Sequence, residues 1–382
     1  MMKKSLLALA FGTFGLGVAE FVMMAILPNV AKDLHIEIAT AGTLISAYSA
    51  GIGIGALFLI IARKYQLKYI LLSLIGIVIT GNLCASIAPD YWTIVFSRFI
   101  SGLPHGAFFG VGSIVAERLA DKGKSTQAVA VMMAGMMVAN LLGVPLATAL
   151  GTYFSWRLAF LMVGCWGILI LFFIYQWIPK ISNLENTSYK EQFRILKKPV
   201  PWLILGATMM GNAAIFCWYS YINPLLTEVS GFSPESITAL MMLAGMGMVA
   251  GNLISGRMSD KYTPARVARV TQGVICCVLL SVFFVAPVSW LNAMLMFIGM
   301  AGFSALSSPE LMLFLRQFRG AEMLGMAFAQ VGFNLGSGLG AYSGGLVLEA
   351  GMGYVFPALV GSGFALIGFF IMTYVIRIYR EG

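Results

Sequence analysis

The chain has 382 residues and a formal charge of +9, and 59% of its residues are hydrophobic while only 10% are charged. Soluble domains carry about 25% charged residues, so this composition excludes an ordinary soluble protein. Apolar runs of about 20 residues recur from end to end, and each is long enough to cross a bilayer core of about 30 Å as a helix. The alternating segments of about 10 residues that indicate an outer-membrane barrel are absent from the sequence. The sequence therefore predicts an all-α, multi-pass membrane protein.

Twelve spans are predicted. The first is retained, because its apolar run is too long for a signal peptide and no cleavage site follows it. The expected spans are residues 5–27, 40–62, 69–88, 91–116, 126–150, 156–178, 201–225, 235–257, 265–286, 288–308, 322–348 and 352–378. A polar, basic loop at 179–200 divides them six and six, which predicts an N-terminal bundle at 1–178, a linker at 179–200 and a C-terminal bundle at 201–382.

The basic residues follow a pattern that sets the topology. With the N-terminus in the cytoplasm, 21 of the 24 Lys and Arg residues fall at cytoplasmic ends and loops. Only Lys32 and Arg157 lie outside, and Arg98 lies within a span. This asymmetry obeys the positive-inside rule and predicts that both termini are cytoplasmic. The positive charge is thus a topology signal, which argues against a nucleic-acid partner.

The five cysteines fall inside apolar segments, and none forms a CxxC pair. They are interpreted as small core residues rather than disulfides or metal ligands.

The two halves resemble one another at an offset near 197 residues. Ala88-Pro89 opens the fourth span as Ala286-Pro287 opens the tenth, and Asn140-Leu141-Leu142-Gly143 corresponds to Asn334-Leu335-Gly336. An internal repeat related by an axis along the membrane normal predicts two pseudo-symmetric six-helix bundles around a central cavity, with rocker-switch alternating access.

Glu20 is the first candidate for chemistry, because it lies deep in the apolar first span. An ionised carboxylate in hydrocarbon is costly, so such a group finds a partner or takes up a proton. Both options suit a proton carrier; a structural hydrogen bond between helices is the alternative.

Arg98 and His105 share one face of the fourth span, since seven residues make about two helical turns, or about 10 Å. Arginine stays charged and would bias Glu20 or His105, whereas histidine can relay a proton near neutrality. A structural anchor for Arg98 and a satisfied core position for His105 are the alternatives. The glycine between them, Gly102, would let a neighbouring helix approach closely.

The repeat lacks all three groups in the second half, where Phe216, Met296 and Phe303 correspond to Glu20, Arg98 and His105. Packing alone therefore does not require them, and proton coupling is expected in the N-terminal half. Glu310 is an exception in the second half, and we expect it at a water-exposed helix end rather than in a relay.

Several stretches carry a resemblance to a known family: GTFGLGVAEF at 12–21, RFISGLPHGAFFGVG at 98–112, ANLLGVP at 139–145 and GRMSDKYTPAR at 256–266. With the two-times-six layout, the whole chain resembles the major facilitator superfamily, and within it the bacterial sugar-efflux and drug:proton antiporters, especially the arabinose-efflux type. The resemblance implies proton-driven export of a small molecule across the bacterial inner membrane. It also implies a lipid-embedded carrier that works as a monomer, with the proton gradient and no cofactor.

The resemblance further implies two sets of gating residues. The glycine-rich fifth span, MAGMMVANLLGVPLATALG at 133–151, contains ANLLGVP, which resembles the antiporter motif. The resemblance assigns Gly135, Gly143 and Pro145 to tight packing against a helix of the other half; a generic close-packed helix pair is the alternative. The loop after the eighth span assigns Gly256, Asp260 and Lys261. The loop 2–3 motif departs from the family pattern, with Arg63 near the usual aspartate, so its gating contacts are not carried over.

The expected substrate cavity is lined by aromatic and amide side chains, which suit a neutral sugar or an amphipathic drug. The candidates are Tyr48, Asn140, Asn212, Trp218, Tyr219, Gln330, Phe333 and Asn334. Core or lipid-facing positions are the alternative for each. No nucleotide or hydrolase motif is present, so the rival functions are a proton-coupled importer or facilitator and, more remotely, an intramembrane enzyme using Glu20 and His105.

Overall fold

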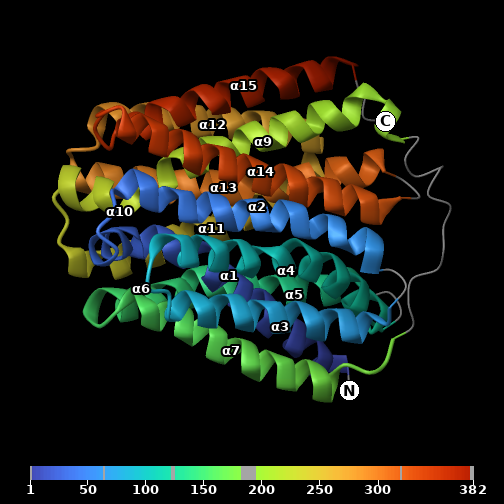
Figure 1. The fold of residues 1–382 in the computed structure, drawn as a ribbon. Coiled ribbons are helices and arrows are strands. Elements are labelled where there is room, and N and C mark those ends of the chain that lie inside the picture. The colour runs from blue at the N-terminus through green and yellow to red at the C-terminus, as the bar shows by residue number, and fades with distance from the viewer. Residues whose placement is uncertain (1, 63–64, 122–124, 182–194, 319–320, 379–382) are drawn as a thin grey trace.

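The structure is a computed structural model of the chain, and it describes residues 2–62, 65–121, 125–181, 195–318 and 321–378. Long helices run side by side along the molecule, and both termini lie at the same end (Figure 1). We call this the terminal end and the opposite one the far end.

The first half contains α1 (Met2–Asp33), α2 (Ile38–Ala62), α3 (Leu67–Ser86), α4 (Tyr91–Arg118), α5 (Ser125–Val138), the π-helical turn η1 (Ala139–Gly143), α6 (Val144–Tyr153) and α7 (Trp156–Trp177). The second half contains η2 (Ile195–Lys197), α9 (Pro199–Tyr219), α10 (Ile222–Pro224), η3 (Leu225–Val229), η4 (Pro234–Ser236), α11 (Ile237–Lys261), α12 (Pro264–Val285), α13 (Ser289–Gln317), α14 (Glu322–Glu349) and α15 (Phe356–Ile378). The described chain is thus nearly all helical, as predicted.

Eleven helices of the described chain are long and apolar enough to cross a membrane, and one of these spans is built from α5, η1 and α6. The remaining expected span, 322–348, is the continuous helix α14. It is not among the eleven, because Gln330, Asn334 and many glycines and serines dilute its apolar character. The composition of α14 is that of a helix packed among other helices rather than one surrounded by lipid.

The two halves repeat the same helix pairings. In the first half α2 packs on α4, α3 on α7, and α1 on α5. Their counterparts six spans later make the same pairs, since α11 packs on α13, α12 on α15, and α9 on α14. The fold is therefore two pseudo-symmetric six-helix bundles, in agreement with the repeat seen in the sequence.

Glycines bring the α2–α4 and α11–α13 pairs into backbone contact. A Cβ atom on Gly55 would overlap the carbonyl oxygen of Leu103, and one on Gly251 would overlap that of Ala301. Gly251 follows Gly55 by 196 residues, so the same close crossing is built twice. Gly102 also meets the α2 backbone, at Tyr48, as expected from the sequence. Small residues allow this approach because helices in lipid associate through packing and not through a hydrophobic driving force.

The halves meet along two interfaces, α2 against α14 and α11 against η1 and α6. The Ser46 hydroxyl donates to the carbonyl of Gly338 at 3.1 Å. Towards the far end, the amide of Asn223, in α10, donates to the carbonyl of Ala25 in α1 (Figure 1). These contacts are between small or polar groups.

The cysteine interpretation is corrected by the burial pattern. All five cysteines are free, but only Cys217 is buried, while Cys84, Cys165 and Cys277 are exposed on the outside of the bundle. Apolar segments of a membrane protein have a lipid-facing side, so an apolar neighbourhood in sequence does not imply a core position.

We expect Gly55→Ala and Gly251→Ala to destabilise the protein by about 1–3 kcal/mol each, the usual cost of overpacking a helix contact. Gly76→Ala is the matched control, because nothing lies within 4 Å of a Cβ there. It should leave stability unchanged or raise it by up to about 1 kcal/mol through helix propensity. Thermal unfolding of the detergent-purified variants measures both effects, and equal melting temperatures for all three would contradict this account of the crossings.

Candidate functional site

Three helices bring Glu20, Tyr48 and His105 together. Glu20 comes from α1, Tyr48 from α2, and His105 from α4. The Nε2 atom of His105 lies 3.7 Å from Glu20 Oε2, and its Nδ1 lies 3.0 Å from the Tyr48 hydroxyl. The His105 ring also stacks on Phe109, one turn along α4, at 5.2 Å between ring centroids. The imidazole is thus held between a hydroxyl and a carboxyl group.

The start of α4 is fixed by Asp90, which positions the face carrying Arg98 and His105. The Asp90 carboxylate accepts hydrogen bonds from the Thr93 amide at 2.9 Å and from the Thr93 hydroxyl at 2.8 Å. This is an N-cap, which satisfies an amide that the helix leaves unpaired. These hydrogen bonds lower the pKa of the Asp90 carboxyl. From this cap α4 runs without interruption through Pro104 to Arg118.

Arg98 lies beside this group as a fully buried cation. Its Nη1 donates to the carbonyl of Ala19 at 2.8 Å, and its guanidinium lies 4.1 Å from the centre of the Tyr48 ring. A second ring, Phe160 of α7, lies at 5.5 Å. Arg98 makes no ion pair within 4 Å in the described part of the chain, and its Nε and Nη2 atoms have no hydrogen-bond partner there. The permanent positive charge of Arg98 is therefore bound to the carbonyl of the residue that precedes Glu20, and it is further stabilised by the faces of two aromatic rings.

The tautomer of His105 follows from its two neighbours. If the Tyr48 hydroxyl donates to Nδ1, the ring proton is on Nε2 and faces Glu20. The opposite tautomer would direct the Nε2 lone pair at a carboxylate oxygen, which is unfavourable when Glu20 is ionised. Of the two neutral tautomers, the arrangement therefore favours the one with its proton on Nε2. Tyr48 acts as the positioning group for that ring.

The equivalent place in the second half holds aromatic rings. Phe216 and Phe303, the repeat partners of Glu20 and His105, contact each other at 5.6 Å between ring centroids. Phe21 of α1 reaches across to both rings, at 6.1 Å from each. Met296, the counterpart of Arg98, is fully buried. The scaffold thus supports an apolar version of the same contact, so the ionisable groups of the first half are not needed for packing.

The residues expected to line the cavity fall into different environments. Asn140, Asn212 and Asn334 are buried, and each donates its amide to the carbonyl four residues earlier, at 3.0, 2.9 and 2.9 Å. Asn334 also contacts the side chain of Gln330 at 3.3 Å, and Phe333 of the same helix is half-buried. Of the elements that carry these residues, η1 packs on α11 and α14 packs on α2, so both take part in the contact between the halves, whereas α9 packs mainly on α14 and α15 of its own half.

The other aromatic candidates, Tyr48, Trp218 and Tyr219, are buried. Tyr48 contacts His105 and Arg98 and so is part of the Glu20–His105 group. Trp218 is buried and faces Gly299 of α13, which favours a core role within the second half. Tyr219 is also buried, with its hydroxyl 3.5 Å from the sulfur of Met241.

Within the antiporter-motif stretch, Gly135 and Gly143 face α1 of their own half, whereas η1 contacts α11 of the other half. A Cβ on Gly135 would overlap the Ala10 carbonyl, and one on Gly143 would meet Val18 and Phe14, all in α1. The approach to the second half is made by Gly245 of α11, which lies against the Asn140 carbonyl in η1. Pro145 begins the next helical segment and is buried. The π-helical turn η1, a type of turn frequent at functional sites, thus forms the contact between the halves.

The family model described as Major Facilitator Superfamily matches residues 9–323. The chain belongs to this superfamily. AraJ of Escherichia coli (strain K12), which is named a transporter, is 44% identical over 97% of this chain and 94% of its own length. The inner membrane transport protein YdhP of the same strain is 35% identical over 94% and 92%. A protein of Helicobacter acinonychis (strain Sheeba) named a sugar efflux transporter is 28% identical over 97% and 93%.

Solved structures of superfamily transporters show the same fold. A bacterial homologue of the human lysosomal transporter Spinster, in an inward-facing and unoccupied conformation, aligns with a TM-score of 0.78 at 14% identity, over 98% of this chain and 97% of its own. The nucleoside transporter NupG aligns at 0.79 and 13% identity, over 98% and 100%. The chain is thus a multi-pass membrane transporter of this superfamily and not an enzyme.

The gating residues at the terminal end of this transporter are only partly described. Gly256 and Asp260 belong to α11, but their side chains lie outside the described structure, as does Arg63 after α2. Lys261, the last residue of α11, is exposed and lies 5.6 Å from the Tyr262 ring.

Glu310 is not at a water-exposed helix end. It is fully buried, and the helix that carries it, α13, continues to Gln317. The expectation was wrong because the tenth span was ended at residue 308, whereas the helix runs nine residues further.

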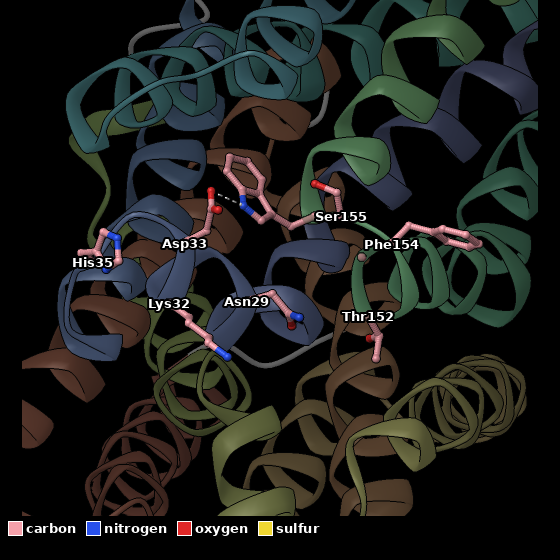
Figure 2. Close-up of a pocket in the computed structure, with 9 residues that line it drawn as sticks. Asn29, Lys32, Asp33, His35, Thr152, Phe154 and Ser155 are labelled. Atoms are coloured by element: carbon pink, nitrogen blue, oxygen red, sulfur yellow. Dashed lines mark hydrogen bonds between the residues drawn. The ribbon is translucent and has the colours of Figure 1, made fainter.

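A pocket of about 390 Å³ opens at the far end, where α1 ends and α6 meets α7 (Figure 2). Asn29, Lys32, Asp33 and His35 line one side, and Thr152, Phe154 and Ser155 the other. Asp33 accepts from Trp156 Nε1 at 3.1 Å and pairs with Arg157, so it ties α1 to α7. None of the expected cavity or coupling residues lines this pocket.

The Tyr48–His105 contact can be tested by nitrogen-15 NMR, since the chain has only two histidines. We expect wild-type His105 at pH 8 to show the Nε2–H tautomer, and Tyr48→Phe to shift the population towards Nδ1–H because the donor to Nδ1 is gone. His35→Gln assigns the spectrum, as His35 is exposed at the far end. An unchanged His105 signal in Tyr48→Phe would rule out the hydrogen bond as the source of the tautomer.

Proposed function

We propose that this transporter is a proton-coupled antiporter that exports a neutral sugar or an amphipathic, drug-like molecule across the bacterial inner membrane. The observation that carries the proposal is the Glu20–His105 contact beside the buried cation of Arg98. Relatives named as sugar efflux transporters support the substrate class and the direction. The topology has both termini in the cytoplasm, following the distribution of basic residues.

Glu20 is the proton carrier in this mechanism. Its side chain is 11% exposed, so water can reach the carboxyl while most of it stays in the protein. Ionised Glu20 is stabilised by the neighbouring Arg98 charge and by the Nε2–H of His105. When Glu20 takes a proton from water it becomes neutral, and the positive charge of Arg98 is no longer balanced. Each protonation state therefore favours a different arrangement of α1 and α4.

Exchange of the proton for substrate follows from the contacts between the halves. Asn140 is in η1, which packs on α11 of the other half, and Asn334 is in α14, which packs on α2, while Phe21 contacts Phe216 across the halves. A solute bound there by amide and aromatic groups would close the two halves around itself. Proton release from Glu20 on one side, after solute leaves on the other, gives antiport by alternating access.

The substrate class is tested by thermal unfolding of the purified transporter with pentoses, hexoses and amphipathic cations. A ligand at 100 times its Kd stabilises the native state by about 2.7 kcal/mol, so a bound sugar raises the melting temperature. Asn212→Ala and Asn334→Ala should abolish the shift, whereas Thr80→Ala, on the exposed side of α3, should keep it. A shift with cations alone would replace the sugar assignment by the drug-like one.

The coupling is tested in proteoliposomes with the sugar or cation that gives the largest shift. An imposed pH gradient should drive uphill movement of that solute by the wild type and not by Glu20→Gln. Downhill exchange should persist in Glu20→Gln, because a neutral carboxamide keeps the shape of the protonated acid. Glu37→Gln, an exposed acid beyond α1, is the control and should remain coupled. Uphill transport by Glu20→Gln would refute the assignment, and the absence of any gradient effect in the wild type would indicate a facilitator.

A further inference from the structure

The second half contains a buried carboxyl group that the mechanism above does not use. Glu310 follows Pro309 in α13, and its side chain is fully buried. Seven residues, or about 10 Å, separate it from the end of that helix at Gln317. The group is therefore inside the bundle and not at its rim.

Gln272 of α12 joins Glu310 to α9. Its Nε2 donates to Glu310 Oε1 at 3.3 Å and to the carbonyl of Ala207 at 2.9 Å. The hydroxyl-bearing side chain of Thr208 lies beside the same carboxyl group. Three polar atoms of this group are buried without a hydrogen-bond partner: Glu310 Oε2, Gln272 Oε1 and Thr208 Oγ1.

Two glycines close the other sides of the group. A Cβ on Gly368 of α15 would lie 2.9 Å from Gln272 Oε1, and one on Gly211 of α9 would lie 3.1 Å from Gln272 Nε2. Four helices, α9, α12, α13 and α15, therefore surround the carboxyl and amide groups at close range.

No cation neutralises Glu310 in the described part of these helices. The basic residues on these helices, and on α11, which also packs on α13, are Arg257 and Lys261 of α11, Arg266 and Arg269 of α12, Arg316 of α13 and Arg377 of α15. No ion pair joins any of them to Glu310 among the described residues. The guanidinium of Arg269, one turn before Gln272, lies 6.0 Å from the Phe369 ring. The other ionisable groups on α9, Cys217 and Tyr219, lie beyond Thr208 along the helix. An ionised carboxylate here would have a hydrogen bond from Gln272 at 3.3 Å, the neighbouring Thr208 hydroxyl and no counter-charge, which is a costly arrangement for a buried ion.

We propose that Glu310 is a second proton-binding site, located in the C-terminal half and occupied in this conformation. The carboxylate takes one proton from water, which forms the Oε2–H bond and leaves a neutral acid. Oε2 then becomes a donor, and two acceptors that lack one, Gln272 Oε1 and Thr208 Oγ1, belong to the same cluster. One proton thus removes the buried charge and supplies the missing donor.

This site is separate from the Glu20 group, which lies in the other half and contacts different helices. A proton-binding site at Glu310 goes beyond the proposed function, and it can be tested without a substrate and without a transport measurement. The Glu20→Gln variant is the background, so that any proton held by Glu20 does not contribute.

The experiment counts protons released when the detergent-purified transporter is unfolded by SDS at pH 7.5 in weakly buffered solution with a pH indicator. An acid that is neutral when folded ionises when unfolded, since the free pKa of Glu is about 4.3. Glu20→Gln/Glu310→Gln should release about one proton fewer than Glu20→Gln. The control Glu20→Gln/Glu349→Gln should match Glu20→Gln, because Glu349 is exposed to solvent at the end of α14 and not buried in the bundle.

Infrared spectroscopy of the folded proteins gives an independent readout. The carboxylic-acid carbonyl band of Glu20→Gln should be missing in Glu20→Gln/Glu310→Gln and retained in the Glu349 control. Equal proton counts and equal spectra would overturn the proposal. A failure of Glu310→Gln to fold would also count against it, because glutamine has nearly the shape of the protonated acid and is likewise neutral.

Discussion

The cost of a charge inside a bundle of apolar helices governs the chemistry of this transporter. Arg98 is the fixed case, because a guanidinium keeps its proton and so cannot avoid the cost by becoming neutral. A hydrogen bond to a carbonyl of α1 and contact with the faces of two aromatic rings stabilise the buried guanidinium. Carboxyl and imidazole groups have another option, since they can gain or lose a proton. When such groups lie beside a fixed charge, their protonation state depends on their distance from that charge.

The two halves show how one scaffold can carry different chemistry. Glu20 and His105 meet in the first half where Phe216 and Phe303 meet in the second. The close helix crossings at Gly55 and Gly251 are preserved in both. In the second half this position is filled by apolar contact between two aromatic rings, whereas in the first half it holds ionisable groups that are unfavourable to bury. The difference between the halves is therefore chemical and not architectural.

Much of the fold could be predicted from the sequence, because apolar runs of bilayer length and an internal repeat leave few alternatives. The face shared by Arg98 and His105 followed from helical periodicity alone. The contact of Tyr48 with His105 could not be predicted, because the two residues come from different helices and the rotation of α2 against α4 is set by glycine contacts that span assignment does not reveal. Glu310 was misplaced because α13 continues beyond the length needed to cross lipid. Gly135 and Gly143 were assigned to the wrong neighbour, since a small residue indicates a close contact but not its partner.

The character of the contacts between the halves has a mechanical consequence. Within each half, glycine crossings fit backbone against backbone, so sliding there would force atoms into one another. Between the halves, a serine hydroxyl touches a carbonyl, and Gly245 lies against the backbone of η1. Large side chains also cross between the halves: Phe21 lies against Phe216 and Phe303, and the Tyr221 hydroxyl lies next to Gly42 of α2. A rocking motion of one half against the other therefore has to move these rings, so the resistance to that motion is concentrated at a few aromatic side chains.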